Sequence, residues 1–158
     1  MSDERSDSPD ERWMREALAL AHAAGDSGEV PVGAVLVVDG IVMGTGSNAP
    51  IGTNDPTAHA EMAALRAAAA AIGNYRLEDA TLYVTLEPCP MCAGALVHAR
   101  VRRLVFGARD LRFGGVRSKF RIADSDLLNH RVEVTEGVLA AECVSLLQAF
   151  FAARRGVE

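Results

Sequence analysis

The sequence predicts an α/β protein in which helices cover both faces of a five-stranded mixed sheet. Two observations lead to this fold class. Runs of β-branched residues alternate with segments of helical apolar spacing, in the order α-β-β-α-β-α-β-β-α. The chain also has 158 residues, 49% of them apolar, which suits one domain with a buried core. We expect a polar, disordered tail at residues 1–7 and a single domain at residues 8–158.

The N-terminal part is expected to hold a helix and a hairpin. Residues 8–11 read as a capping box with proline at the first helical position, and the apolar spacing that follows predicts a helix to about Gly25. Residues 32–38 form a β-branched strand. The two-residue turn Asp39-Gly40 then predicts a hairpin whose return strand begins at residue 41.

The return strand leads to a loop and a second helix. Gly44 and Gly46 weaken the strand, which suggests that another segment passes close to it. Residues 47–54 are expected to form a loop. Asp55-Pro56 combines a cap with a proline and predicts a helix from there to about Ile72.

The C-terminal half alternates strands and helices. The segment 110–129 is a long connection containing Gly114-Gly115, and connections of this length are usually functional or disordered. Cys143 lies on the apolar stripe of the last helix and is expected in the core. The expected elements are a strand at 81–85, a helix at 91–99, strands at 104–107 and 132–134, and a helix from about 139.

Two short motifs carry the chemistry: His59-Ala60-Glu61 and, thirty residues later, Cys89-Pro90-Met91-Cys92. One imidazole and two thiolates suit zinc and leave one corner of a tetrahedron for water. Zinc lowers the pKa of such a water, and Glu61 is the nearest group that could move its proton. Residues at i and i+2 point to different sides of a regular helix, so His59 and Glu61 can converge only over a helix N-terminus or in irregular backbone.

The two motifs together are more specific than either alone. A lone C-x-x-C could be a redox pair, a structural zinc site or two core cysteines. A structural zinc would need a fourth ligand, and only Cys143 remains among the cysteines. The combination H-x-E with P-C-x-x-C is the signature of zinc nucleobase deaminases.

Charge and composition indicate which kinds of binding partner and which cellular compartment to expect. The net charge is −5, but residues 100–121 carry eight basic residues and one acid, which is +7 against −12 for the rest of the chain. This segment could hold a phosphate backbone or form a solvated arginine-rich loop. Three cysteines, no apolar run of about 20 residues and a polar N-terminus predict a cytoplasmic protein without a membrane span.

The chain resembles the bacterial tRNA-specific adenosine deaminases, which convert the wobble adenosine of an anticodon loop to inosine. The resemblance covers residues 13–151. It is carried by the blocks EVPVGAVLV (29–37), DPTAHAE (55–61), LYVTLEPCPMCAGA (82–95), VFGARD (105–110) and NHRVEVTEG (129–137).

The resemblance implies a three-layer α/β/α cytidine-deaminase-like fold and one zinc ion per subunit, held by His59, Cys89 and Cys92. Glu61 would move protons, Asn48 would contact the flipped base, and Asp110 would lie beside the anticodon loop. From the residues alone, Asn48 can both donate to and accept from a base, although a loop asparagine more often satisfies backbone. The family also implies a homodimer that binds the tRNA anticodon stem-loop.

Two regions depart from the family pattern, and two other functions stay open. After Asp110 the family usually shows a lysine and a small glycine- and serine-rich turn, whereas residues 111–120 here read LRFGGVRSKF; the basic C-terminal tail is also short. The alternatives are deamination of a free base or nucleoside of the guanine or cytosine type, and a non-catalytic zinc-folded RNA-binding module.

Overall fold

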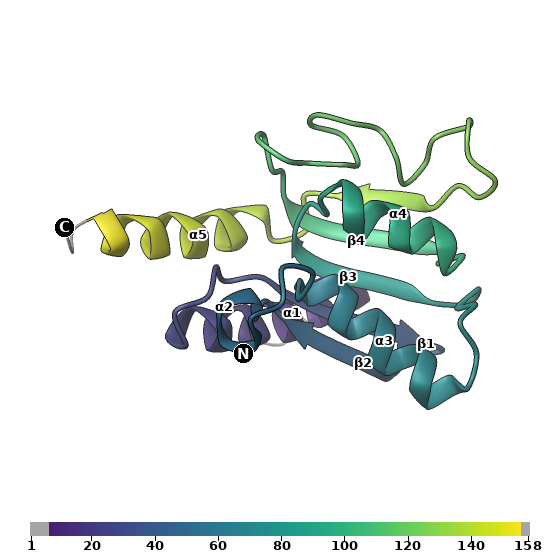
Figure 1. The fold of residues 1–158 in the computed structure, drawn as a ribbon, viewed down its shortest axis with the longest axis horizontal. Coiled ribbons are helices and arrows are strands. Elements are labelled where there is room, and N and C mark those ends of the chain that lie inside the picture. Colours follow the sequence, from purple (N-terminus) through teal and green to yellow (C-terminus); the bar gives the residue numbers. More distant parts are fainter. Residues whose placement is uncertain (1–6, 156–158) are drawn as a thin grey trace.

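A five-stranded sheet forms the centre of the molecule in the computed structural model, which describes residues 7–155 (Figure 1). The strand order is β2-β1-β3-β4-β5. β1 pairs antiparallel with β2 and β3, whereas β3–β4 and β4–β5 are parallel. The strands are β1 (Gly33–Val38), β2 (Ile41–Ser47), β3 (Thr81–Leu86), β4 (Arg103–Ala108) and β5 (Glu133–Glu136). The predicted mixed sheet is confirmed.

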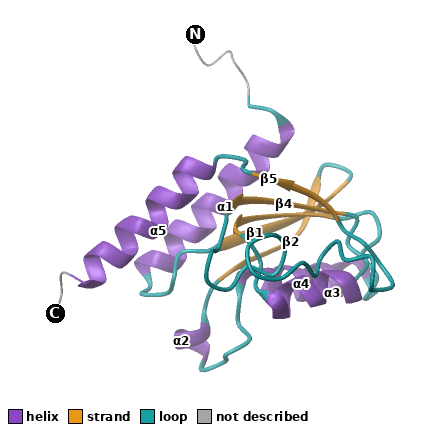
Figure 2. Cartoon of the chain, turned by 90° about the horizontal axis from the view of Figure 1, so that it is seen from above, coloured by secondary structure: helices purple, strands orange, loops and turns teal. Residues whose placement is uncertain are grey.

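Helices cover both faces of this sheet, as predicted (Figure 2). α1 (Pro9–Asp26) and α5 (Ala140–Arg155) lie on one face, and α3 (Ala60–Ile72) and α4 (Pro90–His98) lie on the other. Alternate residues of one strand therefore enter different cores. Leu36 packs in the cluster that includes α3 and α4, whereas Val35 and Val37 pack in the cluster that includes α1 and Cys143.

The first helix and the hairpin form as the sequence predicts. The Ser8 hydroxyl accepts a hydrogen bond from the Glu11 N–H at 3.2 Å, and the Ser8 N–H donates to the Glu11 carboxylate at 3.2 Å, which is a complete capping box. Asp39 and Gly40 have φ angles of 51° and 74°, as a type I′ turn requires. Asp7 belongs to the expected tail and accepts a hydrogen bond from Arg15, while residues 1–6 lie outside the described residues.

The predicted start of the second helix is wrong. Residues 55–59 do not join it, because the Asp55 carboxylate accepts from both the N–H and the hydroxyl of Thr57 and closes a tight turn instead. The helix begins at Ala60, and His59 is its N-cap in extended conformation, with φ −85° and ψ 154°. The loop expected at residues 47–54 also contains a short helix, α2 (Pro50–Thr53).

The second half of the chain follows the predicted order. A connection without regular structure runs from residue 109 to 132 between β4 and β5, and Figure 1 shows it looping above α4. Cys143 is 1% exposed, so its predicted place in the core is confirmed. The rest of the predicted stripe on α5 is less buried, with Phe151 42% exposed. Over residues 7–155, no helix has the length and apolar character needed to cross a membrane.

Candidate metal centre and active site

Two helix N-termini bring three potential metal ligands together. His59 is the N-cap of α3, Cys89 is the N-cap of α4, and Cys92 lies in the first turn of α4. The Nδ1 atom of His59 lies 3.6 Å from the Sγ atom of Cys89 and 3.5 Å from that of Cys92. The ligand atoms of all three residues lie within 4.8 Å of one another.

These distances fit a tetrahedral zinc site. Zn–S and Zn–N bonds of about 2.3 and 2.05 Å at a tetrahedral angle place sulfur and nitrogen about 3.6 Å apart. The observed separations are 3.5 and 3.6 Å. Among the described residues the group contains no fourth histidine, cysteine or carboxylate ligand. Three ligands are the set that catalytic zinc sites use, since their fourth position takes water or substrate.

The two thiols are electrostatically unequal. A hydrogen bond from Cys92 and the contact with His59 lower the pKa of Cys89 to about 4. The same interaction with Cys89, together with burial, raises the pKa of Cys92 above its ordinary value. The N-terminus of α4 also favours negative charge on both sulfur atoms. The opposite shifts of the two pKa values reflect close contact between the sulfur atoms, as expected for two ligands of one divalent cation.

Glu61 lies in the first turn of α3, with a side chain only 4% exposed. Burial raises its pKa to about 7. Because His59 is extended and precedes the helix, His59 and Glu61 need not share a helical face, which removes the conflict in their i, i+2 spacing. A carboxyl group that titrates near neutrality can both accept and donate a proton.

Asn48 and Asp110, the two expected substrate contacts, both have structural partners. The Oδ1 atom of Asn48 accepts from the Ala60 N–H at 2.9 Å, which caps α3 and leaves the Asn48 NH₂ group to donate. The Oδ1 atom of Asp110 accepts from the N–H groups of Arg112 and Phe113 at 3.1 Å each. Asn48 thus adjoins the metal-ligand residues through Ala60, whereas Asp110 organises the turn that follows it.

Two buried glutamates were not singled out from the sequence, and one of them adjoins the metal-ligand residues in the chain. Glu29 is 5% exposed and accepts from the N–H groups of Ile51 and Gly52. Glu87 is 2% exposed and directly precedes Pro88-Cys89. Burial would raise the pKa of Glu87, but hydrogen bonds from Ser118 and from backbone N–H groups outweigh it and hold the pKa below its ordinary value. Their only sequence signal is an acidic residue beside an otherwise apolar strand.

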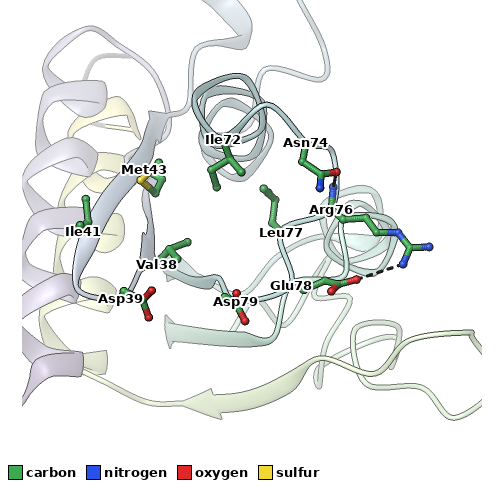
Figure 3. A pocket seen from close by; sticks show the side chains of 10 residues that line it. All are labelled: Val38, Asp39, Ile41, Met43, Ile72, Asn74, Arg76, Leu77, Glu78 and Asp79. Atoms are coloured by element: carbon green, nitrogen blue, oxygen red, sulfur yellow. Dashed lines mark hydrogen bonds and ion pairs between the residues drawn. The ribbon is translucent and has the colours of Figure 1, made fainter.

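A pocket of about 430 Å³ lies away from this chemistry (Figure 3). Val38, Ile72 and Leu77 line it, and Arg76 and Glu78 form an ion pair at its rim. It opens where β1 ends and β3 begins, whereas the cysteines follow the end of β3. The metal-ligand residues therefore lie at the other end of these strands.

Comparison with known proteins identifies the family. The family model for MafB19-like deaminases matches residues 8–155. A tRNA-specific adenosine deaminase of Haemophilus influenzae is 56% identical over 147 residues, covering 92% of this chain and 85% of that protein. The Bacillus subtilis tRNA-specific adenosine deaminase is 47% identical over 142 residues, covering 90% and 88%.

The chain belongs to the tRNA-specific adenosine deaminase family. A solved structure from a study of A-to-I editing by tRNA:A34 deaminases aligns with a TM-score of 0.83 and 46% identity, covering 86% of this chain and 99% of that one. A guanine deaminase from Nitrosomonas europaea aligns with a TM-score of 0.79 at 26% identity, covering 93% and 86%. The predictions of a cytidine-deaminase-like fold and a hydrolytic deaminase are confirmed.

In this family member, much of the basic segment at residues 100–121 is neutralised within the fold. Four of its arginines form ion pairs with acidic residues. The pairs are Arg103–Asp10, Arg109–Glu136, Arg117–Asp124 and Arg121–Asp124. Arg112 and Lys119 are exposed, in the part of the segment that differs from the family pattern. The structure thus favours a smaller basic surface than the count of charges suggested.

Proposed function

We propose that this protein deaminates adenosine to inosine at the wobble position of a tRNA anticodon loop. The observation that carries the proposal is the zinc-compatible spacing of His59, Cys89 and Cys92 beside buried Glu61. The relatives named tRNA-specific adenosine deaminase, up to 56% identical over nearly the whole chain, support the choice of substrate.

In this proposal His59, Cys89 and Cys92 hold one zinc ion per subunit. Zinc at such a site makes water nucleophilic at neutral pH by lowering its pKa. Glu61 takes one proton from the attacking water and delivers it to adenine N1. It then takes the second proton, from the hydroxyl group now on C6, and gives it to the departing amino group. Water and adenosine are consumed, and inosine and ammonia are formed. The near-neutral pKa of Glu61 suits it to both transfers.

We also propose that the substrate base is held beside Asn48 and that Asp110 lies next to the anticodon loop. Since the Asn48 Oδ1 atom is bonded to the Ala60 N–H, its NH₂ group has a defined direction from which to donate to an adenine nitrogen. The bases of an anticodon loop are already unpaired, so extruding one costs less than in a duplex.

The test is a Glu61→Gln variant assayed with an anticodon stem-loop bearing adenosine at the wobble position. We expect one zinc per chain and a loss of inosine formation of at least about 10²–10⁴-fold, because general acid–base catalysis is removed. Glu78→Gln is a matched control, since Glu78 is exposed at the far pocket. Inosine formation at the normal rate by Glu61→Gln would remove Glu61 from the mechanism.

A free base or nucleoside is the second candidate substrate, favoured by the structural likeness to the guanine deaminase. It predicts turnover without RNA and little dependence on salt, whereas RNA binding weakens steeply as salt rises. Parallel assays for ammonia with guanine, cytidine and adenosine separate the two. Zinc binding and RNA binding with no turnover on any substrate would favour the non-catalytic module instead.

We further infer a homodimer, a single domain over residues 8–158, and a cytoplasmic location. An apolar groove of about 370 Å³ between α3 and α4, with Tyr75 69% exposed beside it, supports self-association on this face. With Cys89 and Cys92 assigned to zinc and Cys143 a buried thiol, the three cysteines leave no pair for a disulfide, which fits a reducing compartment. Sedimentation of the zinc-loaded protein tests the dimer, and a purely monomeric mass at micromolar concentration contradicts it.

A further inference from the structure

Glu87 connects residues 88–92, here called the metal-ligand segment, to a turn that comes much later in the chain. Its N–H donates to the Ala108 carbonyl at 2.8 Å, and its 2%-exposed side chain turns toward residues 110–118, here called the 110–118 turn. The Oε1 atom accepts from the Asp110 N–H at 3.0 Å and from the Ser118 hydroxyl at 2.5 Å. The Oε2 atom accepts from the N–H groups of Val116, Arg117 and Ser118 at 3.1, 2.7 and 2.9 Å.

Two glycines let the 110–118 turn pack directly on this carboxylate and on the metal-ligand segment. A Cβ atom at Gly114 would overlap the Glu87 carboxylate. A Cβ atom at Gly115 would come within 2.8 Å of the Pro90 nitrogen and 2.9 Å of the Cys89 carbonyl carbon. The Gly115 N–H also donates to the Pro88 carbonyl at 2.7 Å. The turn is therefore joined to the segment that carries the first cysteine ligand.

The outer part of the turn presents an aromatic and cationic surface. Phe113 is 61% exposed, and the Arg112 guanidinium carbon lies 6.0 Å from the centre of its ring. The N–H groups of both residues donate to Asp110, which fixes the backbone beneath them. Unpaired RNA bases stack on aromatic rings and guanidinium planes, and each stacked base contributes about 1–3 kcal/mol.

We propose that Glu87 is a positioning residue that holds the 110–118 turn against the metal-ligand segment, so that Phe113 and Arg112 stack on an unpaired base flanking the target adenosine. The proposal rests on the proposed function and names one of its substrate contacts. Because all five hydrogen bonds to the carboxylate come from one turn, removing an acceptor oxygen releases that turn before it disturbs the sheet.

The test compares Glu87→Gln, Phe113→Ala and the double variant on the anticodon stem-loop. Glutamine keeps the size of the side chain but turns an NH₂ group toward N–H donors. For Phe113→Ala we expect KM to rise about tenfold, corresponding to one lost stacking contact, and for Glu87→Gln at least as much, because Arg112 is released as well. In both variants kcat should stay near the wild-type value with one zinc per chain. The double variant should be no worse than the poorer single variant, because Glu87→Gln already releases the ring that Phe113→Ala removes.

Ser118→Ala keeps the proposal testable if Glu87→Gln does not fold. It removes one of the five donors, and we expect KM to rise about threefold with zinc unchanged. Additive effects in the double variant, a fall in kcat or zinc content with KM unchanged, or a normal KM in both Glu87→Gln and Ser118→Ala would overturn the positioning role. A wild-type protein inactive on the stem-loop would instead refute the proposed function.

Discussion

Replacement of Gly46 by alanine tests how firmly β2 holds the helix that carries Glu61. Gly46 faces the start of α3, where an added Cβ atom would lie 2.7 Å from the Ala63 Cβ atom, 2.8 Å from the Ala64 nitrogen and closer still to the Ala60 carbonyl oxygen. Ordinary contact begins at 3.4 Å, so the Ala63 distance alone falls short by 0.7 Å. We therefore expect α3 to move away from β2 by about 1 Å, since the obstructing atoms belong to the backbone and to a methyl group.

The expected losses of stability and of catalytic rate follow from the size of this movement. Overpacking of a core contact costs about 1–3 kcal/mol. In a chain of this size that corresponds to a melting temperature lower by about 2–12 °C. Ala60 lies between His59 and Glu61, and a misplacement of about 1 Å in a catalytic group can cost about 100-fold in rate. We thus expect kcat to fall by about 10–100-fold.

Thermal unfolding and single-turnover inosine formation measure the two effects. Gly94→Ala in α4 is the control, because an added Cβ atom there meets nothing within 4 Å in the described chain. Alanine should stabilise that helix by about 0.5–1 kcal/mol. If Gly46→Ala melts and turns over like the wild type, the close packing of β2 on α3 does not hold the site in place.

Other predictions concern the stability of α1 and its contacts with the sheet. Ser8→Ala removes the capping box and should cost about 1 kcal/mol, lowering the melting temperature by about 2–4 °C; an unchanged value would show that the cap is redundant. Burial and a hydrogen bond to Asp10 raise the pKa of Tyr83 to about 12. The contribution of the neutral Tyr83 to the free energy of unfolding is therefore complete below pH 10 and is lost between pH 10 and 12. Tyr83→Phe should lack this alkaline loss in urea unfolding. The hydrogen bond from Arg103 holds the pKa of Asp10 below 3.8. The contribution of this ion pair to the free energy of unfolding is therefore present above pH 3.8 and is lost at lower pH. When the free energy of unfolding is measured in urea as a function of pH, Asp10→Asn should lose less stability at acidic pH than the wild type. An unchanged loss at acidic pH would contradict the pairing of Asp10 with Arg103.

The start of α3 differs from the sequence prediction for a physical reason. The sequence offers one helix-start signal in this region, Asp55-Pro56. Asp55 is a residue type that often caps helices, but its carboxylate accepts from Thr57 instead. The first N–H of α3, that of Ala60, donates to the side chain of Asn48, twelve residues earlier. Local propensity cannot identify a cap supplied by another segment, so the predicted helix began too early. The error matters because the extended conformation of His59 is what turns its imidazole toward the cysteines.

The sequence by itself determined the order of the strands and of the longer helices, the capping box of α1, the hairpin turn and the chemical types of the metal-ligand residues. These features depend on neighbours in the chain, through periodicity, caps and turn residues. The tertiary structure alone decided which distant groups meet. It set the 3.5–3.6 Å spacing of His59 with both cysteines, the burial of Glu61, and the five donors gathered around Glu87. It also paired Arg103 with Asp10 across 93 positions. Such pairings follow from the order of strands in the sheet, which brings remote segments side by side, and no local pattern encodes them.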